Sequence, residues 1–279
     1  MSARELQRVA VRMLYDEPFL ERVYGDVHTA TADCDLTADE RSWLTIPDRR
    51  AWKVDPLRRS RSLAALVEEF AVSVALLVRT SREATTLLDS FFSSDAFHRG
   101  MQEGASLAQI FGSWLVDQTV YRDIVLLEAA LARVRRVYES GSAAPDLAGE
   151  VVPESTVVLA AGVEVHEFAA GTVQAFEAAL VALRVRSVAE AALDRNFDLP
   201  LPQPLDGRAG TLVDGRRPDP RLESLSVELA RVLNVAAGPI PVTEFVEQAA
   251  EHGADADDCL GLLNSFAEDG TIQVIGDQA

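Results

Sequence analysis

The residues best able to do chemistry are four histidines and two cysteines: His28, His98, His166, His252, Cys34 and Cys259. A metal site built from neighbouring residues needs these types at short, regular spacing. No two histidines are close enough for that, and no His-Glu-x-x-His pattern occurs. Two distant cysteines form neither a disulfide framework nor a zinc site. We therefore expect no metal and no cofactor in this chain.

The sequence motifs of common catalytic centres are also missing. There is no Gly-x-Ser-x-Gly elbow for a nucleophile and no glycine-rich loop with a lysine for phosphates. Adjacent acids such as Glu68-Glu69 and Asp257-Asp258 fit solvated helix faces, where carboxylates are poor evidence of acid–base chemistry. We expect a protein without a catalytic residue of its own. An enzyme whose groups converge only in the folded chain is the alternative.

Three polar residues stand in apolar contexts. His166 lies in the segment 163–168, where alternation places it on a polar strand face together with Glu164. His98 lies at the start of a helix, where capping or solvent exposure accounts for it. Glu128 borders the apolar face of a helix, so we expect it to pair with an arginine from another helix.

The formal net charge of −18 is unevenly distributed along the chain. Residues 1–140 hold 18 basic and 21 acidic residues (−3), whereas residues 141–279 hold 8 and 23 (−15). Because a phosphate backbone repels such a surface, the charge disfavours nucleic-acid binding by the second half. We expect this half to bind polypeptide instead.

A basic cluster at residues 48–61 departs from this acidity. It holds six basic residues among fourteen, with a tryptophan between them. Basic and aromatic side chains together can bind an acidic protein surface or nucleic acid. We predict partner docking here, and pairing with the chain's own acids is the alternative. The candidate residues are Arg49, Arg50, Trp52, Lys53, Arg58, Arg59 and Arg61.

Apolar residues recur at helical spacing through residues 1–140, which predicts a compact helical bundle. Several of these helices begin with capping residues. Thr37 with Glu40 has the capping-box spacing, and Asp16 can cap a short helix. One longer continuous helix is predicted over about residues 60–77.

The second half changes its periodicity after a segment of linker composition at residues 141–153. β-Branched residues at 156–159 and 163–168 predict a hairpin. The segment 199–220 is rich in proline and glycine and is predicted to be a long connection. Together these segments belong to a second domain that spans residues 154–279.

The last sixty residues follow the winged-helix order of helix, short strand, helix, helix and strand. The predicted segments are 222–233, 240–242, 243–251, 259–267 and 271–275. The expected fold class is therefore mostly α with an α+β C-terminal part. It combines an N-terminal helical bundle with a winged-helix-like module.

Hydropathy predicts a soluble protein. No apolar run reaches the roughly 18 residues that a bilayer span requires. Residues 1–14 alternate charged and apolar residues, which indicates an amphipathic helix rather than a secretion signal. We expect a cytoplasmic protein without a membrane partner.

Several segments of the helical part resemble a known protein family. They are Leu88-Asp-Ser-Phe-Phe92, Phe97-His98, Ser106-Leu-Ala-Gln-Ile-Phe-Gly-Ser-Trp-Leu115 and Leu126-Leu-Glu-Ala129. Their pattern is similar to that of the partner subunits of multinuclear non-heme iron oxygenases, which modify ribosomally made peptides. The resemblance covers nearly the whole chain and rests on pattern and order rather than on an invariant motif. The stretch 69–72 lacks a proline expected after its phenylalanine.

The resemblance implies a division of labour between two proteins. The iron would belong to a separate oxygenase, and this subunit would bind the leader of a precursor peptide and present it to that enzyme. An exposed strand edge can accept such a segment as an added strand. A winged-helix transcription regulator that binds DNA is the alternative function. By resemblance, the candidate peptide-binding residues on strand edges are Val157, Leu159, Val163, Val165, Phe168, Ile272 and Val274.

Overall fold

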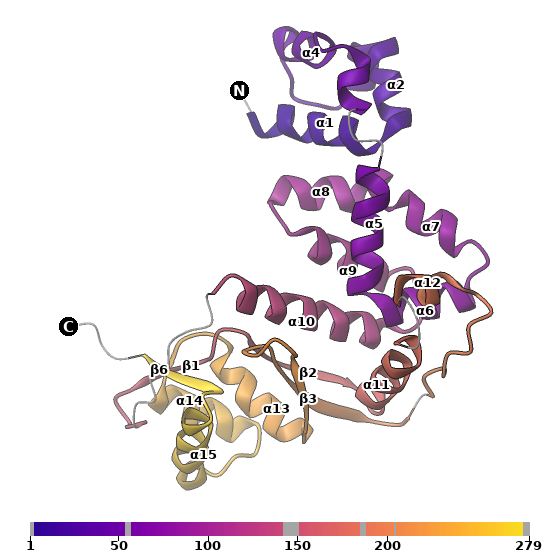
Figure 1. Cartoon of the computed structure of the whole chain (residues 1–279). Coiled ribbons are helices and arrows are strands. Elements are labelled where there is room, and N and C mark those ends of the chain that lie inside the picture. Colours follow the sequence, from indigo (N-terminus) through magenta and orange to yellow (C-terminus); the bar gives the residue numbers. More distant parts are fainter. Residues whose placement is uncertain (1–2, 54–56, 142–150, 185–187, 204, 276–279) are drawn as a thin grey trace. The chain divides into compact units, whose positions relative to one another are not determined.

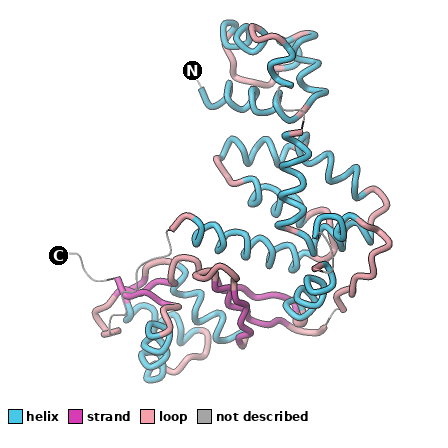
Figure 2. Tube along the Cα trace, in the orientation of Figure 1, coloured by secondary structure: helices cyan, strands magenta, loops and turns pink. Residues whose placement is uncertain are grey.

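A computed structural model of the chain describes residues 3–53, 57–141, 151–184, 188–203 and 205–275 (Figure 1). Contacts divide the chain into two compact units. The first comprises Met1–Val125 with Leu180–Leu199, and the second comprises Leu126–Ala179 with Pro200–Ala279. The structure is mostly helical, and its described strands all lie in the second half of the sequence (Figure 2). Among the described residues no helix combines the length and apolarity that crossing a bilayer requires.

The described secondary-structure elements of the first unit are all helices, and none is a strand. Two further helices, α10 (Arg122–Glu139) and α11 (Thr172–Leu183), are divided between the units. The elements of the first unit are α1 (Ala3–Tyr15), α2 (Glu17–Gly25), α3 (Val27–Ala30), α4 (Ala38–Thr45), η1 (Arg49–Lys53), α5 (Arg58–Glu69), α6 (Ala71–Thr80), α7 (Ala84–Ser90), η2 (Phe91–Ser93), α8 (Asp95–Glu103), α9 (Leu107–Val116) and α12 (Val188–Leu193).

Local capping interactions set the beginnings of several of these helices. The Asp16 carboxylate accepts a hydrogen bond from the Phe19 amide at the start of α2. Thr37 and Glu40 form a complete capping box on α4, in which each side chain accepts from the other residue's backbone. Both caps were predicted, because such signals are contained within four residues of sequence.

The prediction of one continuous helix over about residues 60–77 was wrong. The chain leaves the helical conformation at Phe70 (φ −116°, ψ 41°), where α5 ends and α6 begins. Phe70 is fully buried, and its ring packs edge-on against Phe111 of α9 at 5.4 Å. Because α6 is buried over nearly its whole length, tertiary packing determines its direction more than periodicity does.

The second unit contains two antiparallel three-stranded sheets with the orders β5-β1-β6 and β2-β3-β4. Helices from the C-terminal part pack with them. The elements are β1 (Thr156–Leu159), β2 (Val163–Ala169), β3 (Arg208–Asp214), β4 (Arg221–Leu225), α13 (Val227–Asn234), η3 (Val235–Ala237), β5 (Ile240–Pro241), α14 (Val242–Glu251), α15 (Ala256–Glu268) and β6 (Ile272–Ile275).

The prediction of a hairpin between 156–159 and 163–168 was wrong. β1 lies between β5 and β6, whereas β2 pairs with β3 in the other sheet. The turn between them has Gly162 at φ 83°, a conformation that favours glycine, and directs β2 away from β1. The alternation of apolar and polar residues along a strand predicts which residues share a face, but it does not predict which strand pairs with it.

The segment predicted to be a long connection, 199–220, contains strand β3. Proline and glycine nearby favoured a loop, yet β3 is deeply buried from Gly210 to Asp214. Residues 222–225, predicted to begin a helix, belong instead to β4, and α13 starts later with Ser226 as its cap. Gly210 has a packing role here, because β3 passes close to α13 at this point.

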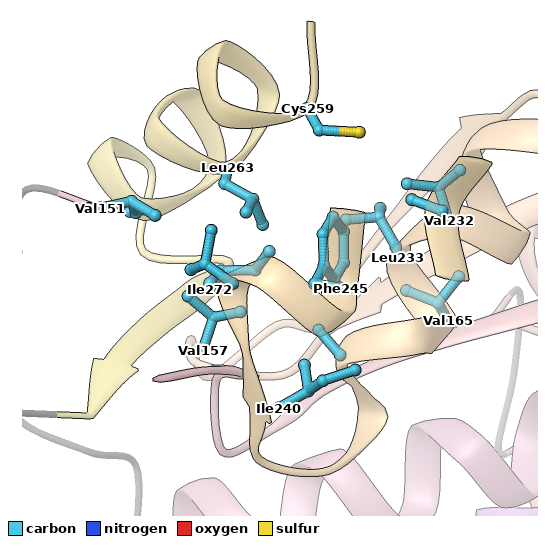
Figure 3. Packing of buried hydrophobic residues seen from close by; sticks show 14 of the residues in the cluster. Val151, Val157, Val165, Val232, Leu233, Ile240, Phe245, Cys259, Leu263 and Ile272 are labelled. Carbon is cyan, nitrogen blue, oxygen red and sulfur yellow. The ribbon is translucent and has the colours of Figure 1, made fainter. Parts of the chain in front are cut away.

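One apolar core joins the two sheets and the helices of the second unit. Side chains from both sheets and from α13, α14 and α15 converge on Phe245 (Figure 3). Phe245 and Val157 are fully buried, and Val165 and Ile272 are buried with them. Burial of this kind contributes about 1.5–3 kcal/mol per large apolar side chain, so the two sheets are stabilised as one structure.

The approach of β3 to α13 predicts a stability effect. A Cβ atom on Gly210 would lie 2.6 Å from the Ala230 Cβ and 2.6 Å from the Ser226 carbonyl oxygen. We expect Gly210→Ala to lower the free energy of unfolding by about 1–3 kcal/mol, measured by urea titration. Gly238→Ala is the control, since no atom lies within 4 Å of its added Cβ and its backbone is extended. Equal effects of the two substitutions would contradict this account.

Candidate functional site

Strand β2 forms one edge of its sheet, and its backbone pattern determines which groups face outward. Gly215 donates to the Gly162 carbonyl at 2.8 Å, and Ala170 donates to the Gly207 carbonyl at 3.1 Å. In an antiparallel pair the bonded residues alternate, so the even-numbered residues of β2 bond to β3. The N–H and C=O groups of Val165 therefore point away from β3. Among the described residues they have no hydrogen-bond partner.

A pocket of about 350 Å³ lies along this edge. Consecutive residues of β2 line it, from both faces of the strand, so the pocket follows the edge rather than one face of the sheet. Its volume is near the lower end of the range of about 300–1,000 Å³ for ligand pockets. The lining residues are Val134, Val137, Leu159, Ala160, Ala161, Gly162, Val163, Glu164, Val165, His166, Asn234 and Ala237.

The charged group of the pocket is Glu164, which is held by two neighbours. Arg133 of α10 donates to its two carboxylate oxygens from Nε at 2.9 Å and from a terminal nitrogen at 2.7 Å. His166 Nε2 lies 2.8 Å from Oε2 of the same carboxylate. Burial on its own would raise the pKa of Glu164, but the hydrogen bonds from His166 and Arg133 outweigh it and lower the pKa below its usual value. The carboxylate is therefore charged and already compensated.

His166 is oriented by the same carboxylate. Because an ionised carboxylate only accepts hydrogen bonds, Nε2 must carry the proton that it shares with Glu164. In the neutral ring Nδ1 is then an acceptor. The ring also stacks on Phe168 with centroids 5.5 Å apart. The polar strand face predicted for His166 and Glu164 is thus the place where the pocket gains its hydrogen-bonding groups.

The predicted peptide-binding residues fall on three different strands. Val163 and Val165 belong to β2 and line the pocket, and Leu159 of β1 also lines it. β1 itself is a central strand with neighbours on both sides, so it offers no edge. Phe168 of β2 is buried. Ile272 and Val274 lie on β6, which is the edge of the other sheet.

In the basic cluster two arginines are engaged within the chain. Arg49 forms an ion pair with Glu21. Arg59 bonds to the Asp89 backbone and lies 3.3 Å from its carboxylate. Trp52 packs on the apolar cluster of α1–α4 and donates from Nε1 to the Tyr24 hydroxyl at 2.9 Å.

The other members of the cluster differ in their surroundings. Arg58 and Arg61 also have interaction partners. Arg50 is exposed, and the side chain of Lys53 lies outside the described residues. For Arg49 and Arg59 the contacts favour the alternative of internal pairing over docking.

The remaining histidines and thiols form no metal site within the described part of the chain, where no group of three or more His, Cys, Asp or Glu side chains could hold an ion. Both cysteines are buried. Burial raises the pKa of the Cys34 thiol to about 11, although Arg8 beside it acts in the opposite direction. This thiol is therefore protonated near neutral pH and is a poor nucleophile.

His98 is not an exposed or capping residue, so that prediction was wrong. Its side chain is buried in the helical unit, and its Nε2 has no described hydrogen-bond partner. Ser94, rather than His98, caps α8. Burial, with a further contribution from Arg12, lowers the pKa of His98 to about 4. His98 is a neutral core residue near neutral pH.

Comparisons of the chain with protein-family models, with curated proteins and with solved structures found no match. The family resemblance therefore rests on the sequence pattern alone.

The contacts of Arg59 predict a loss of stability on charge reversal. Arg59→Glu places a carboxylate beside Asp89 and removes the bond to its backbone, so we expect the free energy of unfolding to fall by roughly 1–2 kcal/mol. Arg50→Glu is the matched control, because this exposed arginine lies in the same cluster. Urea unfolding of the two variants provides the comparison. An Arg59→Glu protein as stable as the control would show that the contacts of Arg59 with Asp89 contribute little to stability.

The buried His98 predicts a pH dependence. Its pKa is about 4 in the folded chain and about 6.5 when unfolded, so the unfolded state binds the proton first as the pH falls. The stability that depends on a neutral His98 is fully present above pH 6.5. As the pH falls from 6.5 toward 4, the free energy of unfolding decreases by up to about 1.4 kcal/mol per pH unit. In urea titrations between pH 7 and pH 4, His98→Leu should lose less stability than the unmodified chain. Parallel pH profiles would contradict the burial argument.

Proposed function

We propose that this protein binds an extended polypeptide segment as an added strand along the edge of β2. The observation that carries the proposal is the outward N–H and C=O pair of Val165, which lies beside a pocket lined by the same strand. An added strand gains affinity from backbone hydrogen bonds and selectivity from side-chain pockets, and this edge offers both.

The sequence resemblance supports a more specific proposal about the segment and its destination. In that proposal the segment is the leader of a ribosomally made precursor peptide, and the protein presents it to a separate iron-dependent oxygenase. The iron would be held by that enzyme. The role of this chain would be binding and positioning, and Glu164, compensated by Arg133 and His166, serves to position the pocket rather than to react.

We further infer that the C-terminal elements form a winged-helix-type module. The order α13, β5, α14, α15, β6 supports this, as does the pairing of β5 and β6 on either side of a third antiparallel strand. That third strand is β1, which precedes the helices in the sequence rather than following them.

The alternative function, a transcription regulator that binds DNA, has less support from charge. Residues 219–279 contain 2 basic and 12 acidic residues. In a helix–turn–helix the second helix contacts the DNA, and in this module that helix would be α15. Asp258 is exposed on α15 and would repel phosphates. Retardation of duplex DNA at low salt would favour the regulator, and its absence would exclude that role for the module.

A proline substitution tests strand addition. The Val165 amide does not bond to β3, so Val165→Pro removes an outward donor without breaking the ladder. Val165→Ala is the control, because it also loses part of the side chain but keeps the amide. Nine-residue peptides selected from a display library by the unmodified protein should bind Val165→Pro at least about fivefold more weakly than Val165→Ala.

Fluorescence anisotropy with labelled peptides measures these affinities, and circular dichroism confirms that both variants are folded. Equal binding by the two variants would exclude β2 as the edge that the peptide joins. The presentation step has its own test. Complete modification of a precursor by such an oxygenase without this protein would show that no presentation is needed.

A further inference from the structure

The residues that line the pocket beside β2 are of two kinds. The walls are apolar and come from several elements: Val134 and Val137 of α10, Leu159 of β1, and Val163 and Val165 of β2. The polar lining consists of Glu164, His166 and Asn234. Pockets of this composition bind an apolar body and use a few polar groups to select its orientation.

A cationic side chain of a bound peptide would gain little from Glu164, because the hydrogen-bonding positions of this carboxylate are already used. Both of its oxygens already accept hydrogen bonds from Arg133, and Oε2 also lies beside His166 Nε2. A lysine or arginine of the peptide would enter next to the Arg133 guanidinium and would find a carboxylate whose charge is compensated. The acidity of the second half is therefore not the basis of selection inside this pocket.

His166 offers the opposite kind of recognition. Its Nε2 proton is directed to Glu164, and no described residue bonds to Nδ1, which in the neutral ring is an acceptor. A purely apolar guest such as phenylalanine would displace water from this acceptor without pairing it, and an acceptor that loses its water without gaining a partner is costly. A guest with a hydroxyl or N–H group at its end would satisfy it.

We propose that the pocket selects a tyrosine of the bound peptide, with its ring against the apolar walls and its hydroxyl donating to His166 Nδ1. This inference rests on the proposed function, because the peptide backbone must join β2 for its side chain to reach the pocket. A tyrosine combines a large apolar ring with a polar tip, and the two kinds of lining residue match these two parts.

Two substitutions of His166 separate its two nitrogens. The amide of His166→Gln can reach the position of Nε2 and keep the contact to Glu164, but it supplies no acceptor at the position of Nδ1. The shorter amide of His166→Asn places its oxygen near the position of Nδ1 and gives up the contact to Glu164. Each variant is first checked for unchanged thermal unfolding.

The probes are two pools of nine-residue peptides in which the central position is fixed as tyrosine or phenylalanine and the other positions are randomised. We expect the unmodified protein to retain the tyrosine pool about fivefold better than the phenylalanine pool, as one neutral hydrogen bond predicts. His166→Gln should reduce this ratio to about one, and His166→Asn should keep it above one.

The outcomes separate this inference from the proposed function. Equal retention of both pools by the unmodified protein would overturn tyrosine selection and leave strand addition in place. Failure to retain either pool would overturn both. Loss of the ratio in His166→Gln and His166→Asn alike would show that the imidazole ring, rather than its Nδ1 acceptor, makes the distinction, and would also overturn the proposal.

Discussion

Backbone groups at the edge of a sheet need partners, and this constraint shapes the second unit. The sheet β2-β3-β4 has two edge strands, β2 and β4, and the side chains beside their outward backbone groups differ. On β4 the side chains of Arg221 and Glu223 form an exposed ion pair at 3.0 Å, and charged side chains of this kind discourage further pairing. On β2 the outward groups of Val165 face a pocket with apolar walls. An edge left unprotected beside a concave surface is suited to a strand from another polypeptide.

The Arg133–Glu164–His166 group makes this edge a defined site. A carboxylate that is largely withdrawn from water is stable only with compensating partners, and Glu164 has a guanidinium on one side and an imidazole on the other. The same bonds tie α10 to β2 and orient the His166 ring, which also stacks on Phe168. The compensation of the Glu164 charge thereby positions both α10, which forms a wall of the pocket, and the His166 ring, which carries the Nδ1 acceptor.

The sequence predicted the features that depend on neighbouring residues. The caps at Asp16 and Thr37 and the shared face of Glu164 and His166 follow from spacings of two or three residues. It did not predict which strands pair, because the partners of Val157 lie near the C-terminus and those of Val165 lie beyond two helices. The pocket was missed for the same reason, since its lining comes from segments far apart in the chain. The burial of His98 likewise depends on packing between helices that no local pattern reveals.

The position of β1 has a consequence for how the second unit is built. The C-terminal segments have a helix and strand order that suggests an independent module, yet the middle strand of their sheet is Thr156–Leu159. Val157 of that strand, Val165 of β2 and Phe245 of α14 share one core. The C-terminal helices therefore cannot complete their sheet without the segment that leads into β2. The inner face of β2 belongs to the core of α13, α14 and α15. The proposed addition of a peptide strand to β2 would therefore be linked to the packing of these helices.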